Sequence, residues 1–169
     1  DLADIEAIAS SVIDFATFEV SDEKPERIDF RSLVEAVADG FGAASLASAP
    51  GQGRALVCVA RPVALKRCVT NLVQNAVKYG KKAQLSLRGS GDRILLTISD
   101  EGPGIPPAQL DAVFAPFVRI DGSRSRETGG HGLGLAIARN IARDAGGDIT
   151  LANRPRGGLE ATLTLPLAA

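Results

Sequence analysis

Residues 71–106, NLVQNAVKYGKKAQLSLRGSGDRILLTISDEGPGIP, decide the fold of this chain. The stretch begins with apolar residues at helical spacing, and these continue a helix that Pro62 opens and Gly80 stops. Short apolar runs at 84–87 and 94–99 follow, with the turn sequence GSGD between them, which predicts a β-hairpin. A helix followed by a hairpin and a Gly- and Pro-rich turn indicates a compact α/β fold.

The sequence on either side adds further expected elements. Residues 2–18 predict a helix with a broad apolar stripe and an acidic remainder. Ser32, with Glu35 three residues later, is typical of a capping box at a helix start. The other expected elements are strands at 27–31, 55–60, 149–152 and 159–165, helices at 32–47 and 133–145, and an irregular segment at 102–132 with one short helix at 107–113.

The composition is close to the average for globular domains. The chain has 169 residues, of which 45% are hydrophobic and 4% aromatic, so one core of mainly aliphatic side chains is expected. The net charge of −1 argues against a disordered chain and against a protein that coats nucleic acid. Cys58 and Cys68 lack metal-ligand spacing and are expected to be buried thiols in a reducing compartment. No apolar run reaches membrane-spanning length, and the absence of Met predicts a fragment or a processed product.

Three polar side chains share one face of the helix over 71–79. Asn71, Asn75 and Lys78 stand at positions i, i+4 and i+7, while apolar residues fill the opposite side. A carboxamide oxygen is a hard ligand that suits Mg²⁺, and a Lys ammonium suits a phosphate. The face is therefore a candidate metal–phosphate surface, although an ordinary amphipathic helix with a wet polar face would show the same pattern.

The motif DEGPGIP, residues 100–106, directly follows an apolar strand. Asp100 ends the strand, where its carboxylate can face a cleft and accept a hydrogen bond. An adenine amino group is a natural donor to such a carboxylate. Gly102 and Gly104 would let the backbone approach a flat ligand closely. The alternative is a turn that only ends the strand.

The motif GGHGLGLAIA, residues 129–138, is a Gly-rich loop that opens a helix. Free N–H groups and the helix dipole make such a helix start a candidate anion site. It is neither a Walker A loop nor a dinucleotide fingerprint, because no Gly-Lys-Ser/Thr and no βαβ unit accompany it. His131, the one histidine of the chain, could donate to a phosphate or lie exposed. The alternative for the whole motif is a flexible hinge followed by a capped helix.

Together these motifs resemble the ATP-binding catalytic domain of bacterial sensor histidine kinases, within the GHKL ATPase superfamily. NLVQNAVKY is similar to the N box, DEGPGIP to the first glycine box, VFAPFVR (113–119) to the F box and GGHGLGLAIA to the second glycine box. The resemblance covers about residues 27–167 and rests on four boxes in order. It implies a two-layer α/β sandwich, with a mixed sheet of about five strands under three helices and a long ATP lid.

The resemblance also implies roles for single residues. Asp100 would bind the adenine amino group, Asn75 would ligate Mg²⁺, and Lys78 would reach a phosphate. Asn75 and Lys78 are then the residues expected to act on the reacting phosphates, and Phe114 would help to anchor the lid. The remaining expected nucleotide contacts are Asn71, Tyr79, Gly102, Gly104, Ile105, Phe117, Gly130, His131, Gly132, Leu133 and Gly134.

The resemblance further predicts the domain organisation and the partners. Residues 1–20 resemble the end of a dimerisation hairpin, 21–26 a linker and 27–169 the catalytic domain. The resemblance implies ATP and Mg²⁺ as cofactors, a response-regulator Asp as the later acceptor, and no nucleic acid as a partner. The hairpin's phosphoacceptor His is absent here, so we expect a His-bearing dimerisation domain as a further partner. The parent is expected to be an inner-membrane receptor with this domain in the cytoplasm. Another GHKL ATPase branch, a protein-serine kinase of the same fold and a nucleotide-sensing module remain alternatives, although residues 71–79 hold no acid that could serve hydrolysis.

Overall fold

A five-stranded mixed sheet forms one layer of the molecule. The computed structural model describes residues 1–20, 22–47, 53–116 and 133–169. The strand order is β2-β4-β5-β7-β6, with β2 parallel to β4 and every other pair antiparallel. The bounds are β2 (Ala44–Leu46), β4 (Ala83–Ser90), β5 (Arg93–Ser99), β6 (Asp148–Asn153) and β7 (Leu159–Pro166).

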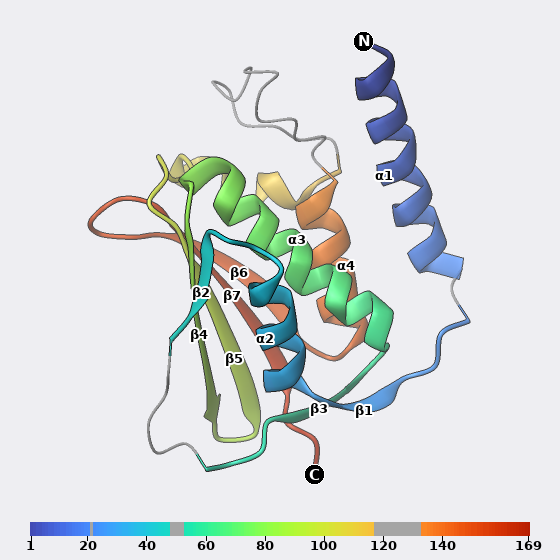
Figure 1. Cartoon of the computed structure of the whole chain (residues 1–169), viewed down its shortest axis with the longest axis vertical. Helices are drawn as coiled ribbons and strands as arrows, with labels where there is room; N and C mark the ends of the chain where they lie inside the picture. Colours follow the sequence, from blue (N-terminus) through green and yellow to red (C-terminus); the bar gives the residue numbers. More distant parts are fainter. Residues whose placement is uncertain (21, 48–52, 117–132) are drawn as a thin grey trace.

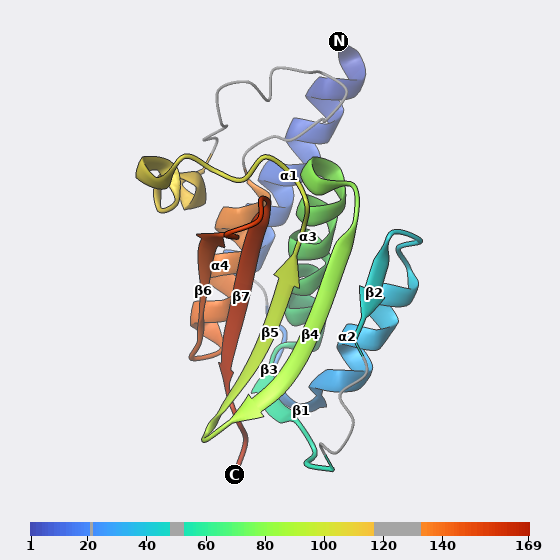
Figure 2. The same cartoon turned by 90° about the vertical axis from the view of Figure 1, so that its left-hand side faces the viewer.

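Three helices pack on one face of this sheet and complete the expected two-layer α/β sandwich (Figures 1 and 2). A small antiparallel pair, β1 with β3, lies at the end of the sandwich where the C-terminus emerges (Figure 1). The N-terminal helix α1 lies beside α4, outside the sandwich (Figure 1). The bounds are α1 (Leu2–Val20), β1 (Glu26–Asp29), α2 (Phe30–Asp39), β3 (Val57–Ala60), α3 (Pro62–Gly80), α4 (Gly134–Asp144) and two 3-10 turns, η1 (Pro107–Gln109) and η2 (Ala112–Phe114).

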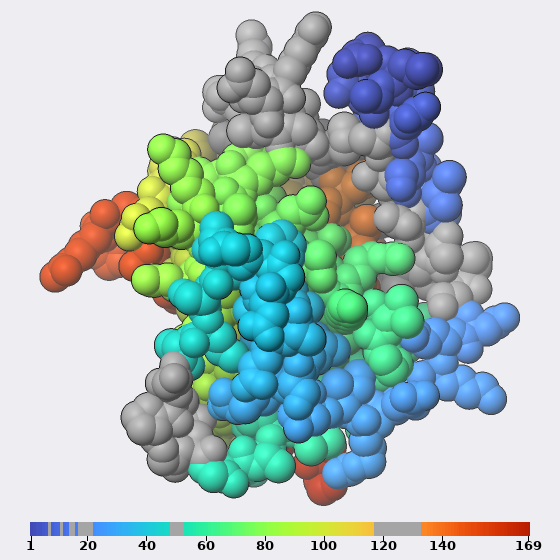
Figure 3. All heavy atoms as spheres, in the orientation of Figure 1, coloured from blue at the N-terminus to red at the C-terminus, as the bar shows by residue number. Residues whose placement is uncertain are grey.

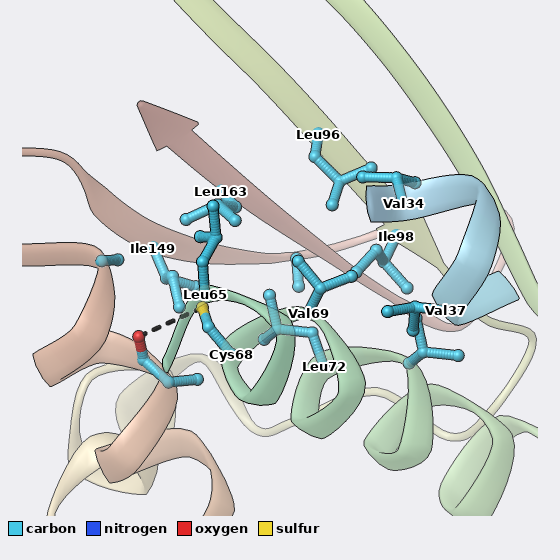
Figure 4. Packing of buried hydrophobic residues seen from close by; sticks show 14 of the residues in the cluster. Val34, Val37, Leu65, Cys68, Val69, Leu72, Leu96, Ile98, Ile149 and Leu163 are labelled. Carbon is cyan, nitrogen blue, oxygen red and sulfur yellow. Dashed lines mark hydrogen bonds between the residues drawn. The ribbon is translucent and has the colours of Figure 1, made fainter. Parts of the chain in front are cut away.

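The core lies between the helices and the sheet, where alternate residues of each strand point to one side. In the space-filling view α2 and α3 lie over much of this layer, while atoms in the colours of β2 and β4 stay visible along one edge of the sheet (Figure 3). Aliphatic side chains dominate the packing, as the low aromatic content predicts (Figure 4). The buried residues include Val34 and Val37 of α2, Leu65, Val69 and Leu72 of α3, Leu96 and Ile98 of β5, Ile149 of β6 and Leu163 of β7.

Both cysteines are buried free thiols, which confirms their expected burial. The Cys68 Sγ donates to the Ala138 carbonyl at 3.3 Å and so joins α3 to α4 (Figure 4). Burial raises the pKa of Cys68 to about 12 and that of Cys58 to about 11, the latter against a backbone hydrogen bond that lowers it.

The segment around α2 differs from the expectation in two ways. The helix begins at Phe30, and its N-cap is Asp29, whose Oδ1 accepts the Ser32 N–H at 3.3 Å. Ser32 therefore lies inside the first turn, and the expected capping box is wrong. The helix also ends at Asp39, not at residue 47, because Gly40 caps it and the chain turns into β2.

The expected short helix at 107–113 is two 3-10 turns, η1 and η2. Pro106 precedes η1 and Pro107 opens it, and Ala115 leaves η2 in an extended conformation, so neither turn grows into an α-helix. Residues 117–132, which include most of the expected lid, lie outside the described residues.

Candidate functional site

The polar face of α3 meets the start of α4. The Asn71 Nδ2 donates to the Gly134 carbonyl at 3.3 Å, so the N box and the second glycine box are in direct contact. Asn75 and Lys78 follow on the same face, and both side chains are half-buried. The structure therefore brings Asn71 to the first residue of α4, while Asn75 and Lys78 continue along the same face of α3.

Asp100 is the only buried polar or charged side chain among the described residues, with 6% of its surface exposed. Its Oδ1 accepts the Gly102 N–H at 2.8 Å and the Leu159 N–H at 3.1 Å. Within the described part of the chain no donor reaches Oδ2, so this oxygen is available to a ligand. One oxygen of this buried carboxylate accepts hydrogen bonds from the protein and the other accepts none from the described residues. A ligand that donates a hydrogen bond can therefore bind to the second oxygen.

The last residue of α3 lies directly on this carboxylate. A Cβ added to Gly80 would stand 2.6 Å from Asp100 Cγ and 2.7 Å from its Oδ1, both shorter than real contacts. Glycine is therefore the only residue that lets the helix end approach the strand end this closely. The contact places the N box and the first glycine box side by side.

An open cleft of about 560 Å³ lies next to this contact. Tyr79 and Gly102, both expected nucleotide contacts, line it from the helix end and from the glycine box. Lys81 and Lys82 bring positive charge to its wall, and Glu101 brings one negative charge. Gly80 and Pro103 complete the lining.

The first glycine box continues into a clamped loop. The Ile105 N–H donates to the Asn153 Oδ1 at 2.8 Å, and the Asn153 Nδ2 donates to the Ile105 carbonyl at 2.6 Å. Ile105 is 6% exposed and lies outside the main hydrophobic cluster. Gly104 takes a positive φ of 74° beside the same Asn153. One carboxamide at the end of β6 thus fixes the loop that the resemblance assigns to adenine.

The F-box turn η2 is fixed by an arginine of α4. The Arg139 guanidinium carbon lies 4.1 Å from the centroid of the buried Phe114 ring, which is a cation–π contact. The same arginine donates through Nε to Asp148 Oδ1 at 3.0 Å. Desolvation raises the pKa of Asp148, but hydrogen bonds from Arg139, the Ile149 N–H and Arg143 outweigh it and lower the pKa to about 2.

The second glycine box is described only from Leu133 onward. Phe117, Gly130, His131 and Gly132 lie outside the described residues. Leu133 is 2% exposed and packs into the hydrophobic core, so its side chain serves packing. Gly134 is the first residue of α4 and meets Asn71 as described above.

Sequence reasoning missed the residues that support the site from behind. These are Gly80 at the end of α3, Arg139 on α4, and Asn153, Arg154 and Gly158 between β6 and β7. From the sequence, the segment from Arg154 to Gly157 between the two closing strands predicts only a turn. Asn directly after an apolar strand, in a turn rich in Gly, was the signal that could have indicated a side chain bound to backbone.

The comparisons with known proteins agree with this geometry. The family model of the histidine kinase-, DNA gyrase B- and HSP90-like ATPases matches residues 60–169. The sensor histidine kinase GtrS of Pseudomonas aeruginosa is 37% identical over 166 residues, which are 98% of this chain and 34% of that protein. The sensor protein RstB of Escherichia coli is 42% identical over 104 residues, 61% of this chain and 24% of that protein. The chain therefore spans about a third or less of the length of these curated relatives.

Two solved structures show the same likeness in three dimensions. The ATP-binding domain of PrrB from Mycobacterium tuberculosis superposes with a TM-score of 0.68 at 28% identity, over 86% of this chain and 99% of that one. The histidine kinase domain of the E. coli osmosensor EnvZ gives a TM-score of 0.65 at 32% identity, over 88% and 93%. Family model, relatives and structures confirm the resemblance drawn from the four boxes. The chain belongs to the family of histidine kinase-, DNA gyrase B- and HSP90-like ATPases, as a domain of the sensor histidine kinase type.

Proposed function

We propose that this chain is the catalytic part of a two-component sensor kinase, which transfers the γ-phosphoryl group of ATP to a histidine on a dimerisation domain. The observation that carries the proposal is Asp100, a buried carboxylate with Oδ2 left over at the junction of the N box and the first glycine box. The adenine amino group would donate to this oxygen, and Tyr79 would line the base pocket.

The polar face of α3 fits a nucleotide-bound Mg²⁺. Among the described residues no group of three or more acidic, His or Cys side chains could hold a metal by itself. Mg²⁺ commonly takes one or two protein oxygens and several from phosphates and water, so the Asn75 carboxamide is a sufficient donor. The bound Mg²⁺ would supply charge neutralisation on the phosphates.

The chemistry that these residues support is positioning and charge compensation. Phosphoryl transfer needs an in-line nucleophile and stabilisation of the charge on the equatorial oxygens. Lys78 would contribute a positive charge from the same helix face as Asn75. The nucleophile would be a neutral imidazole nitrogen of the hairpin, and the later acceptor an Asp of a response regulator.

Hydrolysis is the second candidate, and α3 argues against it. Related ATPases that hydrolyse ATP use a Glu base within the N-box helix, by the family resemblance. The helix here, PVALKRCVTNLVQNAVKYG, has neither Asp nor Glu. A water molecule bound at this face would therefore lack a carboxylate from α3 to take its proton.

We also propose that residues 1–20 are the end of the dimerisation hairpin, 21–26 its linker and 27–169 the catalytic domain. The exposed Leu2, Ile5 and Ile13 on α1 support this, because a helix of a hairpin needs an apolar face for its partner. The domain would work in the cytoplasm as part of a longer, membrane-anchored receptor. Within the described residues, no helix has the length and apolar content to cross a membrane.

The test uses γ-labelled Mg-ATP, this chain and the parent's His-bearing hairpin as a separate chain. Acid-labile, base-stable label on the hairpin would support kinase activity in trans. Accumulation of free phosphate with an unlabelled hairpin would favour the hydrolase. In parallel, Asp100→Asn places a donor where the amino group of adenine needs an acceptor, so calorimetry with Mg-ADP should show weaker binding. Unchanged affinity would contradict the adenine-binding role.

A further inference from the structure

The turn between β6 and β7 holds the strand end that carries Asp100. The Arg154 Nη1 donates to the Asp100 carbonyl oxygen at 2.8 Å, across 54 positions of sequence. Figure 2 shows this turn beside the segment that leaves β5 towards η1. Arg154 is half-buried and Gly158 is buried, whereas the three residues between them are exposed.

Gly158 of the same turn and Leu159, the first residue of β7, also contact Asp100. Leu159 exchanges two hydrogen bonds with it, because its carbonyl accepts the Asp100 N–H at 2.9 Å and its N–H donates to Oδ1 at 3.1 Å. Gly158, with a φ of 94°, lies so close that an added Cβ would overlap the Asp100 carbonyl group. The backbone N–H, the carbonyl oxygen and one carboxylate oxygen of Asp100 are thus all held by residues 154–159.

The turn itself is internally fixed. The Arg154 N–H donates to the Gly158 carbonyl at 2.9 Å, and the Gly157 N–H donates to the Arg154 carbonyl at 3.1 Å. The Arg154 side chain therefore starts from a closed loop, so less conformational freedom is lost when its guanidinium binds Asp100. A planar, permanently charged donor at 2.8 Å restrains the peptide from which the Asp100 side chain leaves.

We propose that Arg154 is a positioning residue for base recognition, which holds the backbone of Asp100 so that Oδ2 points at the exocyclic amino group of a 6-aminopurine. The inference rests on the proposed function, in which Asp100 reads that group. Arg154 acts from the far side, on the carbonyl oxygen, and touches the base only through Asp100. It therefore determines which purine binds, and the phosphate affinity is set by the other residues.

Base discrimination separates this role from a merely structural one. Inosine carries a carbonyl oxygen where adenine carries the amino group, so Mg-IDP lacks the exocyclic donor and presents an acceptor at that position. The experiment measures calorimetric affinities of this chain for Mg-ADP and Mg-IDP in wild type, R154A, R154K and R156A. Arg156 lies in the same turn with an exposed side chain, so R156A is the matched control.

The expected result is that wild type prefers ADP and that R154A reduces this preference by about tenfold, the value of one charge-assisted hydrogen bond. R154K should recover part of the preference, and R156A should keep all of it. In the D100N background R154A should no longer change the preference, because two residues that act through one contact are not additive.

The outcomes distinguish this inference from the proposed function. A wild type that binds neither nucleotide, or both equally, would overturn the adenine-reading role of Asp100 itself. A wild type that discriminates, with R154A equally discriminating or weakened equally for both nucleotides, would overturn the positioning role of Arg154 alone. If circular dichroism shows that R154A does not fold, the same comparison is made with R154K. The preference of R154K for ADP over IDP must then be smaller than that of wild type.

Discussion

The Glu23 carboxylate binds the start of α3, since it accepts the N–H groups of Val63 at 2.9 Å and Ala64 at 3.2 Å. Helix α3 has no cap of its own, because its N-cap residue is Arg61 and makes no side-chain cap bond. The residue that caps the N-box helix therefore comes from the segment after α1, forty positions earlier.

We predict that Glu23→Ala lowers the free energy of unfolding by about 1 kcal/mol, because two N–H groups lose their acceptor and the helix dipole loses a negative charge. Urea unfolding measures the effect. Asp22→Asn changes an exposed neighbouring acid and should leave the stability unchanged. Equal stability of the Glu23 variant and wild type would show that the cap contributes nothing.

A methyl group at Gly80 should disturb the nucleotide site from within. Gly80→Ala would press its Cβ against the Asp100 side chain, whose Cγ would be 2.6 Å away. We expect a loss of about 2 kcal/mol in stability from overpacking, together with weaker Mg-ADP binding. Gly42→Ala is the control, because nothing lies within 4 Å of its added Cβ. Full ADP affinity in the Gly80 variant would mean that the Asp100 position does not matter for binding.

The expected metal role of Asn75 predicts a Mg²⁺-dependent defect. Asn75→Ala should weaken Mg-ATP binding by about tenfold and leave binding in EDTA unchanged, because only the metal-bound form loses a ligand. Gln74→Ala alters the exposed neighbouring carboxamide on the same helix and serves as the control. An equal loss with and without Mg²⁺ would assign Asn75 to the nucleotide and not to the metal.

The sequence predicts the elements whose periodicity is long and strong. The helix from Pro62 to about Tyr79 and the hairpin after it are confirmed, because their apolar residues repeat over several turns and alternate positions. Strand β2 was missed because it has three residues and pairs only with the distant β4. A segment of this length has no local sequence pattern that could predict a parallel partner strand.

In the candidate site, too, residues in a local motif were predicted and residues that depend on distant pairing were not. Asn71 and Asp100 stand in recognisable motifs, and the structure brings both into the contacts described above. Asn153 and Arg154 stand in a turn with no motif of their own, and their targets lie 48 and 54 positions away in sequence. Such supporting contacts arise from how β5, β6 and β7 pair, which residue spacing alone does not specify.

Asp148 should make stability depend on acid. Its folded pKa is about 2, below the ordinary carboxyl value of 3.8, because the arginine and backbone hydrogen bonds outweigh desolvation. A depressed carboxyl pKa gives stability that is complete above the unfolded pKa and is lost as the pH falls towards the folded one. The side chain is 42% exposed, so solvent screening limits the effect to about 1 kcal/mol.

The measurement is the difference in unfolding free energy between wild type and Asp148→Asn as a function of pH. It should be constant at neutral pH and shrink between about pH 4 and pH 2. Asp92→Asn changes a carboxylate whose side chain is 93% exposed and serves as the control. A difference that stays constant down to pH 2 would exclude the Arg139–Asp148 pair as a stabilising contact.

The two thiols should be inert in the folded chain and should set an alkaline limit to its stability. Burial raises both thiol pKa values above the ordinary value of 9.0, to about 11 for Cys58 and about 12 for Cys68. The unfolded chain therefore releases thiol protons first, so the free energy of unfolding should fall as the pH rises above about 9. Neither thiol should react with an aromatic disulfide reagent at pH 8 until denaturant is added.

The double variant Cys58→Ala, Cys68→Ala tests the cause. It should be less stable at pH 7, since the methyl groups fill less space and Cys68 no longer bonds Ala138, yet it should lose less stability than wild type between pH 9 and pH 11. Lysine and tyrosine ionisation is common to both proteins and cancels in the comparison. Parallel alkaline profiles, or rapid labelling of the native chain, would show that the thiols open to solvent without unfolding.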